Sequence, residues 1–156
     1  MTGGFLPLSA VLTSTSMYQM FYADYAQHKA FLHSHTYSGN ALAAAVALEC
    51  LDVIAAENIY QQVQENSSYL LHLMQEVALA TGKLKNVRGI GAIVAADLIT
   101  EEPQQRLGYA VYQKAVDYGA LLRPLGNTIY WAPPLNTSRK VLRTLQDITA
   151  RAICSV

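Results

Sequence analysis

Apolar residues recur at helical spacing over two long stretches of the chain. Asn40 stands directly before the alanine-rich segment 41–56 and predicts an N-capped helix there. A second helix is expected over residues 59–80, with Gly82 placed to end it. Its apolar side consists of Val63, Leu70, Leu73, Met74 and Val77. The pattern therefore predicts two consecutive helices in the first half of the chain.

Shorter elements are predicted before these helices. The apolar residues 8–12 follow two glycines and a proline and predict a buried strand. Residues 17–25 carry aromatic side chains at helical spacing, and serines among residues 14–16 can cap a short helix there. The opening residues read as a loop that feeds a strand, so we expect the chain to begin inside a longer protein.

The second half of the chain changes its period. An apolar run without charges between residues 89 and 96 predicts one buried strand over residues 87–98. Residues 107–118 predict an amphipathic helix that ends at Gly119. Two short strands are expected next, at residues 120–123 and 128–132.

Ser138 is placed to cap a final helix that reaches residue 152 and turns four apolar side chains inward. These four are Val141, Leu142, Leu145 and Ile148. From residue 61 onward the expected order is helix, strand, helix, strand, strand, helix. That order predicts an α+β domain with a small, mostly antiparallel sheet covered on one side by helices.

Composition limits the partners that this chain can bind. Of its 156 residues, 52% are hydrophobic, and 11 Lys and Arg balance 11 Asp and Glu. Because the net charge is zero and the basic residues are scattered, neither a nucleic acid nor an anionic membrane is expected as a partner. The apolar segment 41–56 is shorter than the ~20 residues of a membrane span. We expect a cytoplasmic protein.

Neither the cysteines, the histidines nor the glycines predict a metal or dinucleotide site. Cys50 and Cys154 are read as two reduced thiols, because no Cys-x-x-Cys or His-x-x-x-His spacing is present. Gly89 and Gly91 lack the third glycine of a dinucleotide fingerprint. No serine lies in a Gly-x-Ser-x-Gly turn, so a hydrolase is not indicated.

The segment 33–40, His-Ser-His-Thr-Tyr-Ser-Gly-Asn, is the best candidate for ligand binding. It places hydroxyls and imidazoles just ahead of an expected helix N-terminus, where free N–H groups and the helix dipole favour an anion. Thr36 and Ser38 are donors suited to a phosphate. His33 and His35 alternate, but a metal site would need a third ligand. A structural role for these side chains is the alternative.

Arg123 is a second candidate, because it ends the apolar run 120–122 and precedes a rigid proline. A guanidinium held at such a position can grip a carboxylate with two hydrogen bonds. Tyr130 lies on the next expected strand and could face the same cleft. A solvated surface arginine beside a turn is the alternative.

Three segments of the chain resemble one enzyme family. They are Thr2-Gly3-Gly4-Phe5-Leu6-Pro7-Leu8-Ser9-Ala10, the segment 33–40, and Leu122-Arg123-Pro124-Leu125-Gly126 with Ile129-Tyr130 and Pro133-Pro134. Together they resemble the C-terminal part of the class III aminotransferases, which use pyridoxal 5'-phosphate and have fold type I. The resemblance implies a remnant of the cofactor-binding large domain with a dimer-contact segment at 1–40, an interdomain helix at 41–58 and the small α+β domain at 59–156.

The resemblance also assigns roles to single residues. Thr36 would bind the cofactor phosphate across the interface of a homodimer, and His35 and Tyr37 would flank the cofactor. Arg123 would hold the substrate carboxylate, and Tyr130 would line that pocket. The family's Schiff-base lysine would fall two residues before Met1, and the lysines of this chain lie in polar contexts. We therefore expect no catalytic residue in this chain, and no activity from it alone.

Within the class, the segments most resemble transaminases of biotin synthesis. These enzymes transfer the amino group of S-adenosylmethionine to 8-amino-7-oxononanoate, which gives 7,8-diaminononanoate. Two alternatives stay open: part of another class III transaminase that acts on an ω-amino acid or a diamine, and a non-catalytic dimerisation module.

Overall fold

The structure is a computed structural model that describes residues 1–102 and 104–156. The chain divides into two compact units, residues 1–57 and residues 58–156. The division lies between Glu57 and Asn58, just after a helix that ends at Ala56. Asn58 has a left-handed backbone conformation with φ of 52°. Each unit is described by itself below.

The first unit contains the helices α1 (Thr15–Gln19) and α2 (Ala41–Ala56) and the 3-10 turn η1 (Tyr25–Gln27). The expected cap of α2 is confirmed, because Asn40 Oδ1 accepts hydrogen bonds from the N–H groups of Leu42 (3.0 Å) and Ala43 (3.4 Å). Ser14 caps α1 in the same way, through the N–H of Met17. Short-range signals therefore fixed where both helices begin.

Two expectations for the first unit are wrong. Residues 8–12 form no strand, and Val11 and Leu12 are 92% and 97% exposed. A strand needs a hydrogen-bonded neighbour, and no strand is present among residues 1–57. The aromatic helix expected over residues 17–25 stops at Gln19. With no buried residue, α1 lacks the packing that lengthens a short helix.

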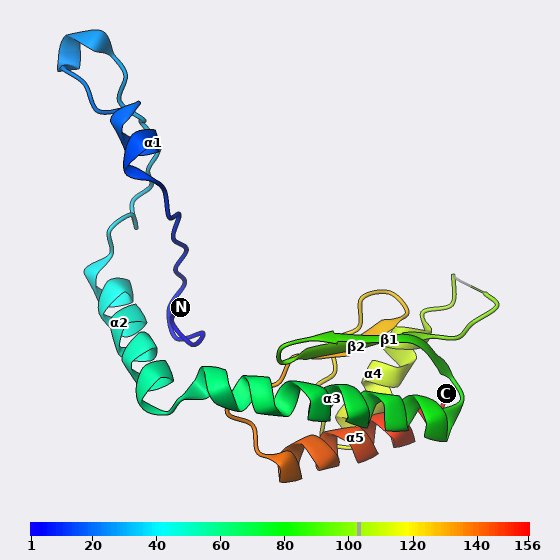
Figure 1. The fold of residues 1–156 in the computed structure, drawn as a ribbon. Coiled ribbons are helices and arrows are strands. Elements are labelled where there is room, and N and C mark those ends of the chain that lie inside the picture. The colour runs from blue at the N-terminus through cyan, green and yellow to red at the C-terminus, as the bar shows by residue number, and fades with distance from the viewer. Residues whose placement is uncertain (103) are drawn as a thin grey trace. The chain divides into compact units, whose positions relative to one another are not determined.

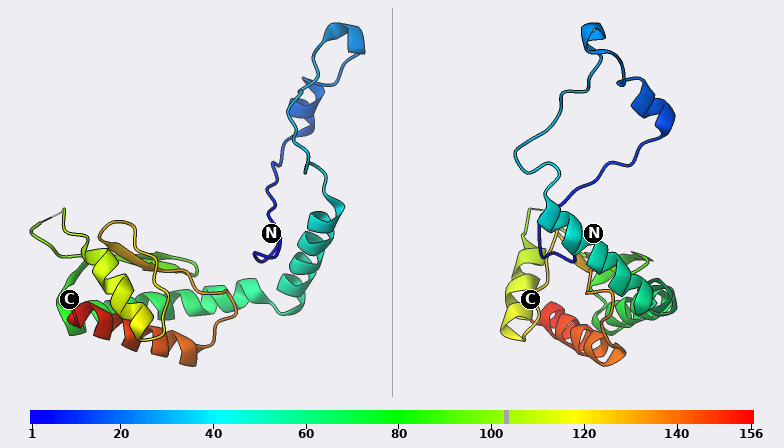
Figure 2. Two further views of the ribbon diagram at one scale, coloured as in Figure 1. Left: turned by 180° about the vertical axis from the view of Figure 1, so that it is seen from behind. Right: turned by 90° about the vertical axis from the view of Figure 1, so that its left-hand side faces the viewer.

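The second unit is an α+β fold, as expected (Figure 1). Its elements are α3 (Ile59–Thr81), β1 (Leu84–Ile90), β2 (Ile93–Leu98), α4 (Leu107–Asp117), β3 (Thr128–Trp131) and α5 (Arg139–Cys154). The strands form one antiparallel sheet in the order β1-β2-β3. The three helices lie together on one side of this sheet, as Figure 2 shows from two further directions.

The core of the second unit lies between the sheet and the helices. Alternate residues of β2 and β3 point into it, including Val94, Ile129 and Trp131. The indole Nε1–H of Trp131 donates to the buried Thr149 hydroxyl of α5 at 3.0 Å. The donor is thereby satisfied inside the core. The helices contribute Leu73, Met74, Val77, Val111, Leu142 and Ile153.

Caps at the helix ends agree with the sequence prediction. Gly82 ends α3 in the left-handed conformation with φ of 63°, which glycine adopts without strain. Ser138 caps α5 through the N–H of Val141. Of the four apolar residues expected to face inward from α5, Leu142 is buried, but Val141 is 55% exposed.

The order of strands differs from the prediction. Residues 87–98 form two strands rather than one, because Gly91 and Ala92 turn the chain back on itself between Ile90 and Ile93. Gly91 has φ of 55°, which favours glycine. Residues 120–123 form no strand; only an isolated bridge pairs Leu125 with Thr128. The segment 120–123 has no hydrogen-bonded strand beside it within the described part of the unit.

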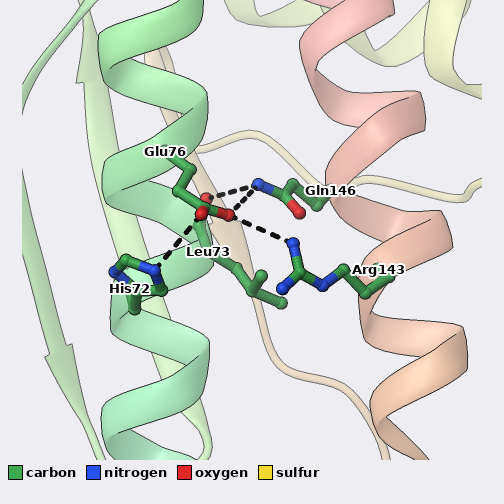
Figure 3. Close-up of polar contacts among 5 residues, drawn as sticks. All are labelled: His72, Leu73, Glu76, Arg143 and Gln146. Carbon is green, nitrogen blue, oxygen red and sulfur yellow. Dashed lines mark hydrogen bonds and ion pairs between the residues drawn. The ribbon is translucent and has the colours of Figure 1, made fainter.

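A polar cluster on the surface joins α3 to α5 (Figure 3). Glu76 accepts hydrogen bonds from Gln146 at 2.7 Å and from Arg143 at 3.4 Å, and pairs with His72 at 3.2 Å. Gln146 also reaches the carbonyl of Leu73 at 3.5 Å. The cluster connects the surfaces of α3 and α5, and none of its members lines either of the two hollows described below.

Candidate functional site

The segment 33–40 folds as a compact exposed turn. Ser38 N–H donates to the carbonyl of His35 at 2.9 Å, and Ser38 Oγ accepts from the His35 N–H at 3.1 Å. His35 Nδ1 accepts from the Tyr37 N–H at 3.2 Å. A neutral imidazole that accepts at Nδ1 carries its proton on Nε2. The turn is thus held by its own side chains, which leaves Nε2–H of His35 as a donor.

Thr36 lies at the tip of this turn and is exposed. Within residues 1–102 and 104–156 its hydroxyl makes no hydrogen bond, so it can donate to a ligand. The helix N-terminus contributes less than the sequence suggested. Asn40 Oδ1 occupies the N–H groups of Leu42 and Ala43, which would otherwise be offered to an anion. An anion here would therefore bind to the hydroxyl of the turn rather than to the first turn of α2.

Arg123 and Tyr130 line the same hollow in the second unit. It has a volume of about 670 Å³ and lies between residues 119–123, the end of β3 and α5. We call it the Arg123–Tyr130 hollow; its walls include Leu121, Arg123, Tyr130, Pro133, Val141 and Ile148. Tyr130 stands between the buried residues Ile129 and Trp131 of β3 and is itself half-buried.

Arg123 also borders a second hollow of about 500 Å³. This hollow lies beside the start of α4 and is lined by Arg106, Tyr109, Tyr112 and Asn127 among others. The Arg106 guanidinium lies 4.6 Å from the centre of the Tyr109 ring, a cation–π contact. Arg123 has no ion-pair or hydrogen-bond partner in the described part of the chain. Its guanidinium is therefore available to an acidic ligand from either side.

The turn that follows Arg123 packs tightly against α4. A side chain on Gly108 would overlap the carbonyl oxygen of Gly126, so only glycine fits at this crossing. The Gly108 N–H donates to Asn127 Oδ1 at 3.1 Å. Backbone bonds between Leu125 and Thr128, at 2.9 and 3.0 Å, close the turn. The position of Arg123 is thus set by α4 and by a two-residue turn.

Asp97 stabilises the neighbouring end of the sheet. It accepts hydrogen bonds from Arg88 (3.1 Å), Asn86 (3.1 Å) and the Thr128 hydroxyl (2.8 Å). The bond from the Arg88 guanidinium is the main cause that lowers the pKa of Asp97 to about 2, and the Thr128 bond adds to it. Asp97 is therefore ionised at neutral pH and holds the strand that carries Tyr130.

The lysines have structural roles or lie in solvent. Lys83 Nζ donates to the carbonyls of Ile153 and Val156 at 3.2 Å each, at the C-terminal end of α5. Lys114 lies 3.9 Å from the carboxylate of Asp117. Lys29, Lys85 and Lys140 are exposed. None of the five is buried.

No group of three or more His, Cys, Asp or Glu side chains comes together in residues 1–102 and 104–156. No helix of those same ranges is long and apolar enough to cross a membrane. Cys50 and Cys154 are both free thiols.

Residues 1–153 of the chain match the model of the family "Aminotransferase class-III". The chain belongs to the class III aminotransferases. Its curated relatives include the adenosylmethionine-8-amino-7-oxononanoate aminotransferase of Helicobacter pylori, which is 40% identical over 136 residues. The enzyme of the same name from Methanocaldococcus jannaschii is 34% identical over 160 residues. These alignments cover 85% and 98% of this chain.

Solved structures agree with the family. The crystal structure of the Methanocaldococcus jannaschii enzyme matches 99% of this chain with a TM-score of 0.92 at 30% identity. A transaminase from the marine bacterium Virgibacillus matches 99% with a TM-score of 0.88 at 25% identity. This chain covers 37% of each of those chains, and 31% and 34% of the two curated relatives. It spans about one third of their length.

The sequence pointed to Arg123 and Tyr130, but it missed the residues that hold them. Asn127 and Gly108, which bond to each other although they are nineteen residues apart, were not identified from the sequence. One signal was available: the helix at Leu107 follows Arg106, which is a poor N-cap, so its cap has to come from elsewhere. Tyr109 and Tyr112 were read as part of an amphipathic helix rather than as the wall of a hollow.

Proposed function

We propose that this chain is the C-terminal part of a pyridoxal-phosphate transaminase that transfers the amino group of S-adenosylmethionine to 8-amino-7-oxononanoate. The observation that carries the proposal is the similarity to relatives of that name over 85% or more of this chain. Segments 1–40, 41–58 and 59–156 would then be a large-domain remnant with a dimer contact, an interdomain helix and the small domain.

The donors of residues 35–37 fit the phosphate end of the cofactor. The Thr36 hydroxyl is exposed and unpaired within the described residues, and the turn around it is already held by Ser38 and His35. In this proposal Thr36 donates to the phosphate of a cofactor that is bound in the partner subunit of a homodimer. His35 and Tyr37 border the same cofactor. When bound, the cofactor would carry the amino group between substrates and act as the electron sink.

Residues of the second unit would bind the acceptor substrate. Arg123 would hold the acceptor carboxylate with two parallel hydrogen bonds, because a guanidinium matches the geometry of a carboxylate. Tyr130 would close one side of the same hollow. The apolar wall of Leu121, Pro133 and Val141 would exclude water from the aliphatic part of the acceptor. Proton transfer is not assigned to this chain, since its lysines are exposed or bound elsewhere.

A chimaera tests this assignment, with this chain in place of the matching segment of the Methanocaldococcus jannaschii enzyme. We expect the chimaera to form 7,8-diaminononanoate from S-adenosylmethionine and 8-amino-7-oxononanoate. The matched control places the corresponding segment of the Virgibacillus transaminase in the same host, and we expect that protein not to accept the oxononanoate. The two chimaeras share every other residue, so a difference in acceptor use belongs to the exchanged segment.

Two outcomes would contradict the proposal. A chimaera that aminates ω-oxo acids or aldehydes in preference to the oxononanoate would indicate another class III transaminase. A chimaera that folds and dimerises but transfers no amino group to any acceptor would indicate a dimerisation module.

A further inference from the structure

The helix α4 begins without a cap from its own sequence. Its N-cap residue is Arg106, whose side chain makes no capping hydrogen bond. Gly108, the second residue of the helix, donates its N–H to Asn127 Oδ1 at 3.1 Å. An asparagine oxygen usually accepts from this helix position when the asparagine directly precedes the helix. Here a side chain nineteen residues further along the chain supplies the same bond.

Asn127 is also fixed from the side of the sheet. Its carbonyl oxygen accepts from the N–H of Leu98, the last residue of β2, at 2.8 Å. The next residue, Thr128, donates its hydroxyl to Asp97, which also lies on β2. Asn127 therefore connects the end of β2 to the start of α4, and it belongs to the turn that follows Arg123.

Arg123 depends on this turn for its position. It is exposed, and within the described residues its guanidinium bonds to no other group. The next residue, Pro124, packs on the first turn of α4: a Cβ atom on Gly108 would lie only 3.1 Å from Pro124 Cβ. The backbone around Arg123, and not its side chain, thus determines where the guanidinium projects.

We propose that Asn127 is a positioning residue for Arg123: its cap on α4 holds the turn from which the carboxylate-binding guanidinium projects. The assignment of the carboxylate to Arg123 rests on the proposed function, whereas the link between Asn127 and the Arg123 backbone does not. Removal of the Oδ1 acceptor frees the Gly108 N–H and loosens residues 123–127 while the core between α3, α5 and the sheet stays intact.

The first test uses the full 156-residue chain and nuclear magnetic resonance. In Asn127→Ala we expect at least about tenfold faster hydrogen exchange at the Gly108 amide, with lower backbone order parameters at Arg123 and Leu125. Asn127→Asp keeps an acceptor oxygen and is expected to restore both. In Asn127→Gln the oxygen is displaced by one methylene, so its exchange rate and order parameters should lie between those of the other two variants. This variant replaces Asn127→Ala in the test if the alanine variant does not fold.

Ser138→Ala is the matched control, because it removes a cap of the same kind from α5. We expect it to leave the hydrogen exchange of the Gly108 amide and the backbone order parameter of Arg123 unchanged. Unchanged order at Arg123 in both Asn127→Ala and Asn127→Gln would overturn the proposal. So would a failure of Asn127→Asp to restore the order.

The second test measures acceptor kinetics in the chimaera described above. Asn127→Ala should raise KM for 8-amino-7-oxononanoate about tenfold and leave kcat within about twofold, because the anchor is displaced and not removed. In an Arg123→Met background the same change should have no further effect. Full additivity of the two variants would contradict action through Arg123. A chimaera without activity, together with the expected magnetic resonance result, would refute the proposed function and leave the positioning role intact.

Discussion

The Thr128 hydroxyl donates to Asp97 Oδ1 at 2.8 Å, across the strand pair that carries Tyr130. Arg88 and Asn86 bind the same carboxylate from β1, so one acidic side chain connects all three strands. These bonds hold the three strands together at the end of the sheet where β3 begins. Tyr130 lies on β3, and the turn that follows Arg123 leads into it.

This carboxylate predicts how stability depends on pH. Because the pKa of Asp97 falls from 3.8 to about 2 on folding, its contribution is fully present above the unfolded value and is lost as pH falls from about 4 towards 2. Allowing for its partial exposure, we expect about 1–2 kcal/mol. Urea unfolding of wild type and Asp97→Asn should therefore differ at neutral pH and converge at about pH 2.

Asp117→Asn is the control for this measurement. Asp117 is exposed and lies 3.9 Å from Lys114, so its removal should change the free energy of unfolding by less than about 0.5 kcal/mol at any pH. A gap between wild type and Asp97→Asn that stays constant down to pH 2 would contradict the account of Asp97.

Gly108→Ala should destabilise the second unit by about 2–3 kcal/mol, although alanine favours helices. The added methyl group would overlap the Gly126 carbonyl oxygen and press on Pro124. Chemical denaturation measures the effect, with Gln113→Ala on the exposed face of α4 as the control. A Gly108→Ala variant as stable as wild type would show that the turn can move away from α4 at little cost.

Thr149→Val should cost about 1–3 kcal/mol, because it leaves the buried Trp131 indole without an acceptor. The size of the side chain is nearly unchanged, so the loss reports the hydrogen bond. Thr149→Ser retains the hydroxyl and should lose less. The chain has one tryptophan, so its fluorescence follows unfolding at this position directly. A Thr149→Val variant as stable as wild type would contradict the contribution of this hydrogen bond.

Features set by a few neighbouring residues were predictable from the sequence. Asn40, Gly82 and Ser138 fixed helix ends because each side chain or backbone conformation acts within one turn of the chain. The Gly91-Ala92 turn was missed, since it lies inside an apolar run and lacks the Asn-Gly signal of tight hairpins.

Features that depend on distant partners could not be read in this way. The segments 8–12 and 120–123 have the composition of strands but no strand beside them in their units. Arg123 could be proposed as a site residue from its place before a proline at the end of an apolar run. Asn127 was not, because its partner on α4 is nineteen residues away and only the folded chain brings the two together.

Acceptor kinetics of Arg123→Met in the chimaera test the central claim most directly. We expect kcat/KM for 8-amino-7-oxononanoate to fall about 10- to 100-fold, because a charged hydrogen bond to the carboxylate is lost. Arg123→Lys should recover only part of this loss, since an ammonium cannot form the paired bonds. Arg151→Met, which removes the same charge from a guanidinium 4.2 Å from the centre of the Tyr118 ring, should leave the value unchanged. Equal losses in Arg123→Met and Arg151→Met would contradict the role of Arg123 as the carboxylate anchor.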